Sequence, residues 1–416
     1  MNILIINHYA GSRSLGSETR PWHLAREFQK AGHSVVIAAA DFSHKRIRNP
    51  VIQPPRQEKT LDGVSYCFYA TPSYENDVGG RGKNISAFAR GIWRDSRRLA
   101  EAFRPQVVVA ASTHPYDIFG ALRIAHRTGA VLVCELHEIW PVYQQEIYRY
   151  DHRDAALLLG EYALDLALKR SDAVVSLLPH GERYLTARGI STGKYLEIPE
   201  AVSVSGSLPL SQRRREYLER LRRSYDFLLI YQGHIGDEKC LHPLVEAAKL
   251  LEEENVAVVM AGNGGYKINL KRTMREAGTK NVYLMDRVED PEKGSFCAMA
   301  DCLFYGDRRN SAAEYGIRSS KLLEYMGWGR PVLTSFAAQS SPVTLSGCGF
   351  NVKDPTPEAL AEGIRRMMAF SPEEREKMGK QGTVYLEEHH SYPLVARRYL
   401  DLFQKLLREK EEKKKN

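Results

Sequence analysis

Long apolar runs and paired cysteines, the marks of membrane-spanning and disulfide-stapled proteins, are missing from this sequence. No stretch reaches the roughly 18 consecutive apolar residues of a bilayer-spanning helix. The six cysteines are scattered and form no CxxC pair, so we expect reduced, mostly buried thiols and no zinc or dithiol redox site. The first residues, MNILIINHYAG, have no basic region before their apolar run, so we expect a first strand and a cytoplasmic protein.

Several nucleotide- and metal-binding motifs are missing as well. The segment NHYAGSRSLGSETR contains no GxGxxG, and Glu18 and Thr19 stand where a Walker loop needs Lys and Ser or Thr. Gly262, Asn263, Gly264 and Gly265 follow an apolar run, but they lack the Walker lysine and the third dinucleotide glycine. No DxD, GxSxG or HExxH occurs, so we expect no metal and no metal-held sugar diphosphate.

What the sequence does contain is an alternation of short β-branched runs with longer helical patterns. The composition, 43% hydrophobic and 26% charged over 416 residues, is that of a globular protein of two or three domains. The alternation predicts βαβ units and mostly parallel, doubly wound sheets. We expect strands at 3–6, 35–40, 64–70, 107–111, 131–135, 173–178, 195–198, 227–232, 256–261, 282–285, 302–305, 332–335 and 349–352.

One linker interrupts this series. Residues 203–211 are rich in Ser, Gly and Pro, and residues 213–223 form a basic helical pattern. We therefore predict Rossmann-like domains at 1–205 and 206–390, then a last helix and a frayed charged tail within 391–416. Two such domains predict a cleft between the carboxyl ends of their strands, where ligands of these sheets bind.

The charge balance favours anionic partners. The chain has 59 Lys and Arg against 51 Asp and Glu, a net charge of +8, which suits nucleic acid, phosphorylated ligands or an acidic membrane, and equally a solvated basic surface. Residues 81–104 alone carry seven basic and two acidic side chains around an apolar helical face that includes Ile85, Phe88 and Ile92. We expect that face to be core; the alternative, kept open by Trp93, is an interfacial surface for anionic lipid.

A set of segments, in their order along the chain, resembles the retaining GT-B glycosyltransferases of family 4, which include bacterial capsule and O-antigen enzymes. They are GSETRPWHLAREFQKAGHSVVIAAA, ELHEIWP, EYALDLALKRSDAVVSLLP, YQGHIGDEKCLHPLVEAAKLL, VVMAGNGG, NVYLMDRV and RSSKLLEYMGWGRPVLTS. The final segment, HHSYPLVARRYLDLFQKLL, resembles the family's return crossover onto the first domain. The resemblance covers nearly the whole chain and implies an acceptor domain followed by a nucleotide-sugar donor domain.

The segment around Ser320 also makes physical sense by itself. The orphan N–H groups and dipole of a helix that starts there attract phosphate, Lys321 adds a positive charge, and Glu324 can accept hydrogen bonds from ribose. The plainer interpretation makes Ser320 an N-cap and Lys321 a surface charge. Lys239, in the loop after Gly233, is expected to grip the same diphosphate as Lys321.

The resemblance also implies a role for individual residues. Catalytic roles fall on His137, Lys239 and Lys321. Donor-contacting positions are Gly16, Gly233, His234, Gly262, Gly264, Arg287, Val288, Ser320, Leu322 and Glu324. Acceptor-side positions are Glu18, Arg20, Arg81, Asn84 and Glu138. Two departures stand out: His234 replaces a frequent arginine, and Gly316 stands where many relatives have the first of two glutamates.

The resemblance implies a hexosyltransferase with no metal or cofactor. It transfers sugar from a nucleotide-diphosphate donor, with UDP favoured, to a glycan or lipid-linked acceptor, with retention, for a cell-surface polysaccharide. We expect it in the cytoplasm, with peripheral contact at the inner membrane face. The alternatives are a GT-B-like sugar-nucleotide epimerase and a basic nucleic-acid-binding protein; the second is disfavoured because the basic residues lack interleaved aromatic platforms, so we expect no nucleic acid partner.

Overall fold

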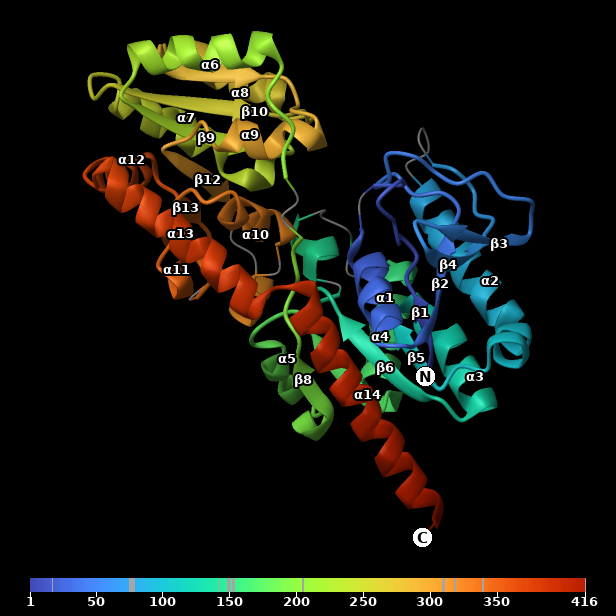
Figure 1. Cartoon of the computed structure of the whole chain (residues 1–416). Helices are drawn as coiled ribbons and strands as arrows, with labels where there is room; N and C mark the ends of the chain where they lie inside the picture. The colour runs from blue at the N-terminus through green and yellow to red at the C-terminus, as the bar shows by residue number, and fades with distance from the viewer. Residues whose placement is uncertain are drawn as a thin grey trace. The chain divides into compact units, whose positions relative to one another are not determined.

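The computed structural model describes residues 1–16, 18–74, 79–140, 142–147, 151, 154–203, 206–308, 311–317, 319–338 and 340–415. The chain divides into two compact units (Figure 1). Unit 1 consists of Met1–Ala201 together with Tyr392–Asn416, and unit 2 consists of Val202–Ser391. Each unit is a sheet covered by helices, and the long helix at the carboxyl end packs on unit 1 against α1.

Unit 1 is built on a sheet of eight strands in the order β3-β4-β2-β1-β5-β6-β7-β8. Every described pairing is parallel except that of β3 with β4. The strands are β1 (Asn2–Ile6), β2 (Ser34–Ala40), β3 (Arg56–Leu61), β4 (Val64–Tyr69), β5 (Val107–Ala110), β6 (Val131–Leu136), β7 (Ala173–Ser176) and β8 (Tyr195–Glu197). The central strands are buried throughout because helices cover both faces, which explains their continuous apolar runs.

The helices of unit 1 form two layers. They are α1 (Arg20–Lys30), α2 (Gly80–Phe103), α3 (Ile118–Thr128), α4 (Ala155–Arg170), α5 (Gly181–Ala187) and α14 (Tyr392–Lys415), with the short turns η1 (Pro115–Asp117), η2 (Tyr143–Ile147) and η3 (Thr192–Lys194). One apolar core lies between the sheet and α1 with α14, and a second lies between the sheet and α2, α3 and α4. Ile85, Phe88 and Ile92 of α2 belong to the buried residues, so the apolar face expected from the sequence is core.

The strand β3 is absent from the sequence-based prediction. Its residues, RQEKTL, are mostly charged or polar, and it occupies the edge of the sheet, where only one neighbour pairs with it. The following Asp62 and Gly63 both have positive φ, +49° and +78°, as a tight hairpin turn requires. The Asp-Gly pair before an apolar run was the sequence signal from which this hairpin could have been predicted.

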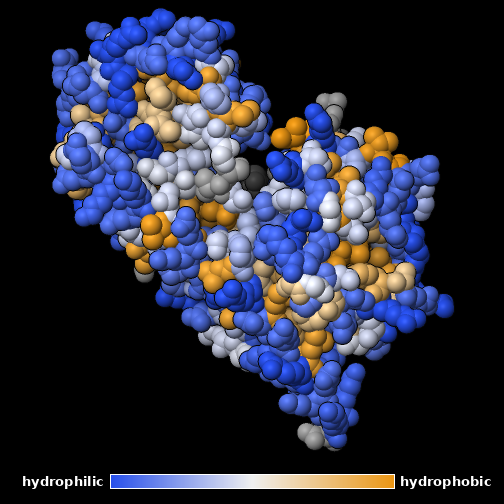
Figure 2. Space-filling view, viewed as in Figure 1, coloured by the Kyte–Doolittle hydropathy of each residue, from blue (hydrophilic) through white to orange (hydrophobic). Residues whose placement is uncertain are grey.

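The charged tail continues α14 as helix to Lys415, and the expectation of a frayed tail is wrong. Lys410 Nζ donates to the carbonyl of Ala130 at 2.8 Å, which ties this part of the helix to the sheet. Lysines in the last turn also suit the negative end of the helix dipole. Figure 2 shows this end of α14 as strongly hydrophilic.

Unit 2 is built on a second parallel sheet, of six strands in the order β11-β10-β9-β12-β13-β14. The strands are β9 (Phe227–Gln232), β10 (Val256–Ala261), β11 (Val282–Met285), β12 (Cys302–Gly306), β13 (Val332–Ser335) and β14 (Gly349–Asn351). The helices are α6 (Gln212–Ser224), α7 (Leu241–Leu250), α8 (Lys267–Ala277), α9 (Lys293–Cys297), α10 (Ser320–Gly327), α11 (Pro342–Ser346), α12 (Pro357–Met368) and α13 (Pro372–His389), with the turns η4 (Asp237–Lys239), η5 (Asp290–Glu292) and η6 (Ser311–Tyr315). Apolar cores lie on both faces of this sheet.

Two further expectations can be compared with the structure. All six cysteines are buried and free, as predicted. Among the described helices, none combines the length and the apolar character needed to cross a membrane.

Candidate functional site

In unit 2, the loops that follow β9 and β10 leave the same edge of the parallel sheet. The first begins at Gly233, whose φ is +151°, and a Cβ there would collide with the side chain of Lys321. A Cβ at Gly262 would strike the carbonyl oxygen of Gly233, and one at Gly264 would strike that of Ile235. Glycine at these positions therefore lets both loops and Lys321 pack closely at the carboxyl edge of the sheet.

Lys321 extends from α10 over the end of β9. Its Nζ lies 4.2 Å from the ring centre of Tyr231 and 5.5 Å from that of Tyr325. Burial, together with the nearby ammonium group of Lys239, lowers the pKa of Lys321 to about 7. Within the described residues no carboxylate forms an ion pair with Lys321. An ammonium group held on aromatic faces without a carboxylate partner is available to an anion.

Lys239 lies in η4, close to Lys321. Its Nζ is 3.4 Å from Oδ1 of Asp307 and 3.8 Å from Oε1 of Glu238. Burial raises the pKa of Asp307, against the opposing effect of Lys239. The structure thus brings the two predicted lysines together and adds Asp307, which the sequence analysis missed although it directly follows β12.

The start of α10 differs by one residue from the plainer interpretation of the sequence. Ser319, not Ser320, is the N-cap, because its Oγ accepts a 3.1 Å hydrogen bond from the N–H of Leu322. The backbone of Leu322 is therefore engaged in the cap. The N–H groups of Ser320 and Lys321 have no partner within the described residues. Glu324 lies one turn further, where burial raises its pKa.

The other predicted donor-side residues lie around this edge with different exposures. His234 is exposed, and its carbonyl accepts a hydrogen bond from the Tyr231 hydroxyl. Arg287 is exposed and donates to Asp290 Oδ1 at 3.3 Å. The side chain of Val288 is buried in the core, so only its backbone can meet a ligand.

Lys267 is a further residue at this edge that the sequence analysis missed. Its Nζ donates to the carbonyls of Gly262 at 3.1 Å and of Met285 at 3.0 Å, and to Asp286 Oδ1 at 2.9 Å. Lys267 therefore ties together the loops that follow β10 and β11. Its ammonium group is used by the protein itself.

In unit 1, His137 directly follows β6. It is nearly buried, and its Nε2 lies 2.6 Å from Oε1 of Glu135. Its Nδ1 has no partner among the described residues. His137 lines a cavity of about 20 Å³ that Ser112 and His114 also line. The contact with Glu135 therefore leaves Nδ1 as the ring nitrogen that contacts no carboxylate among the described residues.

Glu135 belongs to a buried cluster that includes α14. Its Oε1 lies 3.3 Å from Nε of Arg20, and its Oε2 accepts from the hydroxyl of Tyr399. Arg20 also contacts Glu200 at 3.1 Å and Tyr399 at 3.2 Å. Burial alone would raise the pKa of Glu135, but Arg20 and His137 lower it well below its usual range. Arg20 is 4% exposed and its guanidinium is engaged inside unit 1, so its contact with an acceptor stays a prediction.

Asn84, which is also predicted on the acceptor side, is engaged within unit 1 as well. It is fully buried; its Oδ1 lies 2.7 Å from Nε2 of His8, and its Nδ2 donates to Thr71 Oγ1 at 2.8 Å. Both ends of the amide are engaged, so Asn84 fixes the start of α2 and has no group left for an acceptor. Arg81 is exposed, by contrast, and donates from Nε to the hydroxyl of Tyr9 at 3.1 Å.

The three remaining predicted residues of unit 1 are placed differently. Glu18 pairs with Lys45 at 2.9 Å. Gly16 has a φ of +71°, and a Cβ there would lie 2.7 Å from the side chain of Ile47, so another residue would strain the backbone. Glu138 is half-buried and lines a cavity of about 880 Å³ that Arg81 also lines.

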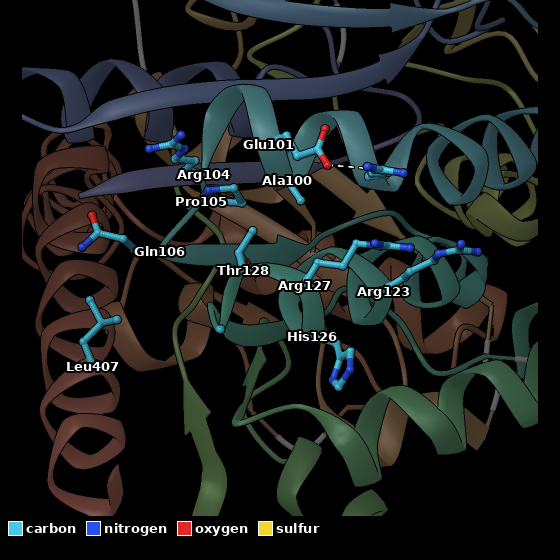
Figure 3. Close-up of a pocket in the computed structure, with 12 residues that line it drawn as sticks. Ala100, Glu101, Arg104, Pro105, Gln106, Arg123, His126, Arg127, Thr128 and Leu407 are labelled. Atoms are coloured by element: carbon cyan, nitrogen blue, oxygen red, sulfur yellow. Dashed lines mark hydrogen bonds and ion pairs between the residues drawn. The ribbon is translucent and has the colours of Figure 1, made fainter. Parts of the chain in front are cut away.

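A second large cavity of unit 1, of about 950 Å³, lies at the opposite, amino-terminal end of β5 and β6 (Figure 3). Its lining is basic, with Arg97, Arg104, Arg123, His126 and Arg127. α2 and α3 both end there, so Arg104, His126 and Arg127 lie at the negative ends of two helix dipoles. Ligands of parallel sheets bind at the other edge. We therefore do not assign this cavity to the substrate.

Neither edge provides an obvious metal site. Within the described residues, no group of three or more His, Cys, Asp or Glu side chains is arranged to hold a metal ion.

Comparisons with known proteins agree with this arrangement. Residues 214–384 match the family described as glycosyl transferases group 1, and residues 16–200 match the glycosyl transferase 4-like domain. The structure is similar to sucrose-phosphate synthase of Thermosynechococcus elongatus, with a TM-score of 0.73 and 16% identity over 98% of this chain and 99% of that one. It is also similar to Anabaena HepE in complex with UDP and glucose, with a TM-score of 0.65 and 13% identity over 97% and 99%.

Two curated relatives match this chain over a smaller share of its length than the solved structures do. WcaI, a colanic acid biosynthesis glycosyl transferase of Escherichia coli, is 26% identical over 34% of this chain and 35% of WcaI. WbpZ, a D-rhamnosyltransferase of Pseudomonas aeruginosa, is 26% identical over 41% of this chain and 43% of WbpZ. The chain matches less than half the length of each of these two relatives.

The fold and its neighbours define the class: two parallel-sheet α/β units of the GT-B glycosyltransferase type. Within that class, the chain belongs to the glycosyltransferases that join a 4-like domain to a group 1 domain. The expected fold class and glycosyltransferase family are confirmed.

Proposed function

We propose that this enzyme transfers a sugar from a nucleotide-diphosphate donor to a glycan or lipid-linked acceptor, with retention of the anomeric configuration and without a metal. The observation that carries the proposal is the pair of lysines in unit 2. Lys321 has no carboxylate partner within the described residues, and Lys239 lies close enough to lower its pKa. Two ammonium groups at the carboxyl edge of a parallel sheet form a site for a diphosphate.

The lysines also supply the chemistry. As the glycosidic bond breaks, negative charge grows on the diphosphate, and fixed positive groups stabilise that charge most in the transition state. The N–H groups of Ser320 and Lys321 at the start of α10, which have no partner in the described part of the chain, add to this stabilisation. The oxygen that leaves can then accept the acceptor's proton, so retention needs no protein nucleophile. Glu324 serves the ribose, and His137 serves the donor sugar through Nδ1.

UDP is the nucleotide that we favour. HepE, a structural neighbour, is described in complex with UDP and glucose and with UDP-glucose. WcaI is described as acting in colanic acid biosynthesis, which supports a role in a cell-surface polysaccharide. Unit 1 supplies the acceptor side, with Arg81 and Glu138 at its cavity.

Peripheral contact with the cytoplasmic face of an anionic membrane is part of the proposal. Arg90 and Arg94 are exposed on α2, and within the described residues neither has a partner. Arg97 and Arg98 are less available, because Glu101 and Glu58 each accept from one of them at 2.8 Å. Trp93 lies between Arg90 and Arg94 and is 48% exposed, which suits an interfacial position.

The test is a thermal-shift panel of UDP, GDP and CDP with their glucose derivatives, followed by a transfer assay with the donor that binds. We expect stabilisation by one nucleotide family, and release of its diphosphate that depends on an acceptor and continues in EDTA. Donor consumption that needs no acceptor, or activity lost with EDTA and restored by a divalent metal, would contradict the proposal.

A further inference from the structure

The cavity of about 880 Å³ in unit 1 has two chemically different ends. Its lining combines residues that follow the carboxyl ends of β1, β5 and β6 with residues of α2, α3 and α4. The volume lies in the range of small-molecule sites, roughly 300–1,000 Å³.

The polar end lies at the edge of the sheet. It consists of Tyr9 and Arg81, which are hydrogen-bonded to each other, together with Glu138 and His114. His114 is 2% exposed, and neither ring nitrogen has a partner among the described residues. Burial, and secondarily Arg81, lower the pKa of His114 to about 3, so its ring is neutral and can both donate and accept a hydrogen bond. These groups suit the hydroxyls of a saccharide.

The other end is apolar. The apolar lining comes from three helices: Ile85, Ala89 and Trp93 of α2, Phe119 of α3 and Leu159 of α4. Arg123 lies 4.2 Å from the centre of the Trp93 ring and covers it from one side. A hydroxyl-rich saccharide alone gains nothing from an aliphatic and aromatic wall of this kind, whereas a hydrocarbon chain does.

The apolar end also reaches the surface. Two of its lining side chains are large, hydrophobic and exposed: Trp93 is 48% exposed and Leu159 is 50%, and the neighbouring Leu158 is 53% exposed. Tyr162, 60% exposed, stacks with Phe119 of the lining. Arg90 lines the cavity beside this rim, and no described residue pairs with it. The rim therefore offers apolar contacts and an unpaired positive charge together.

We propose that the cavity binds an amphiphilic acceptor, with a sugar at His114 and Glu138, an anionic group at Arg90, and an aliphatic chain along Ala89, Trp93 and Leu159. The proposal rests on the proposed glycosyl transfer and selects a lipid-linked acceptor over a free glycan. The basic and apolar rim then matches a chain that emerges from an anionic membrane surface.

Binding of simple alkyl phosphates tests this without any sugar transfer. Hydrocarbon burial favours binding by about fourfold for each methylene, so we expect dodecyl phosphate to bind at least tenfold more tightly than octyl phosphate below their micellar concentrations. Titration calorimetry gives both affinities, and inorganic phosphate should not displace the chain. Equal affinities for the two chains, or displacement by inorganic phosphate, would overturn the proposal.

Two substitutions on one helix locate the bound chain. Ala89→Glu places a carboxylate in the apolar wall, whereas Ala102→Glu places the same group on the exposed side of α2, outside the cavity. We expect dodecyl phosphate affinity to fall at least tenfold in the first variant and to stay at the wild-type value in the second. Equal loss in both, or no loss in Ala89→Glu with an unchanged melting temperature, would place the chain elsewhere.

Fluorescence gives an independent location. A terminal bromine on the dodecyl chain quenches tryptophan only at contact, so quenching should fall in Trp93→Phe and persist in Trp328→Phe, which alters unit 2. Binding of UDP-glucose, measured in the same samples, separates the two proposals. If UDP-glucose binds but the dodecyl chain does not, the amphiphilic acceptor is wrong and the proposed sugar transfer stands. If the protein neither binds a nucleotide nor transfers a sugar, the proposed function itself fails.

Discussion

The side chain that most directly links structure to chemistry is Lys321. Its environment disfavours the charged form, because burial, the ammonium group of Lys239 and, more weakly, Lys293 all lower its pKa, which is about 7. A diphosphate bound beside it has the opposite effect and raises the pKa again. Donor binding is therefore coupled to uptake of a proton.

The first prediction concerns this coupling. UDP-glucose should bind most tightly below pH 7, where Lys321 is already charged, and affinity should fall by up to about tenfold per pH unit between pH 7 and the higher pKa of the complex. Calorimetry in buffers of different ionisation enthalpy measures the proton uptake. Lys321→Arg, which stays charged, should bind with little pH dependence above 7. Affinity that rises from pH 7 to pH 9 in the wild type would contradict the account.

Not every residue role can be read from the sequence, and Arg20 shows why. It lies beside a glycine loop, where an exposed acceptor contact was a sound expectation, yet its partners Glu135, Glu200 and Tyr399 are 115, 180 and 379 positions away. A local sequence pattern cannot predict contacts between residues so far apart in the sequence. Lys239 and Lys321 were predictable because loop glycines and a helix start leave a local trace, whereas His114 becomes notable only through its burial and missing partners.

At the scale of elements, α14 is fastened to unit 1 through Tyr399. This side chain contacts Glu135 and Arg20, and Glu135 also contacts His137. A hydrogen bond to a charged group contributes roughly 1.5–3 kcal/mol, and its loss here leaves a buried carboxylate with one partner fewer.

The second prediction is that Tyr399→Phe lowers the free energy of unfolding by roughly 1.5–3 kcal/mol, because the ring stays and the hydroxyl goes. Urea denaturation measures the change. Tyr162→Phe is the matched control, since Tyr162 is 60% exposed, and it should unfold within roughly 0.5 kcal/mol of wild type. A Tyr399→Phe variant as stable as the control would show that the buried cluster does not hold α14.

The third prediction concerns the outer face of α2. Replacing Arg90 and Arg94 with Gln should weaken binding to vesicles with anionic lipid by about 2 kcal/mol, roughly thirtyfold, since each basic residue near such a surface contributes about 1 kcal/mol. Co-sedimentation at constant ionic strength gives the partition coefficients. The charge-matched control replaces Arg213 and Arg215 on α6, exposed in unit 2. If both pairs weaken binding equally, only net charge matters and α2 is not the membrane-facing helix.

Elements with a strong apolar pattern were predictable, and those without one were not. Buried strands such as β9 and β10 are apolar at nearly every position and agree with their predicted bounds. The polar edge strand β3 has no such pattern, because half-solvated positions accept charged residues as readily as apolar ones. The helical tail of α14 was missed for a related reason: a contact from Lys410 to Ala130, remote in sequence, holds it.

At the scale of the whole molecule, the chain assigns different tasks to its two units. Unit 2 holds the predicted phosphate-binding lysines, and unit 1 holds His137 and the amphiphilic cavity. The general organisation follows from the order of segments in the sequence, because each segment is local to one strand and its loop. The identity of the substrates does not follow from the order of segments, because a few contacts within the cavities decide it.

The central claim is that Lys239 and Lys321 stabilise the leaving diphosphate, and steady-state transfer kinetics of Lys239→Ala and Lys321→Ala test it most directly. Removing one preorganised donor typically costs on the order of 10²–10³ in rate, or roughly 3–4 kcal/mol. We predict losses of that size in kcat for each variant, with a melting temperature at or above wild type for Lys321→Ala, and a normal rate for Lys377→Ala, an exposed lysine of α13. Near-normal kcat in either lysine variant would contradict the account and make His234 the leading phosphate partner.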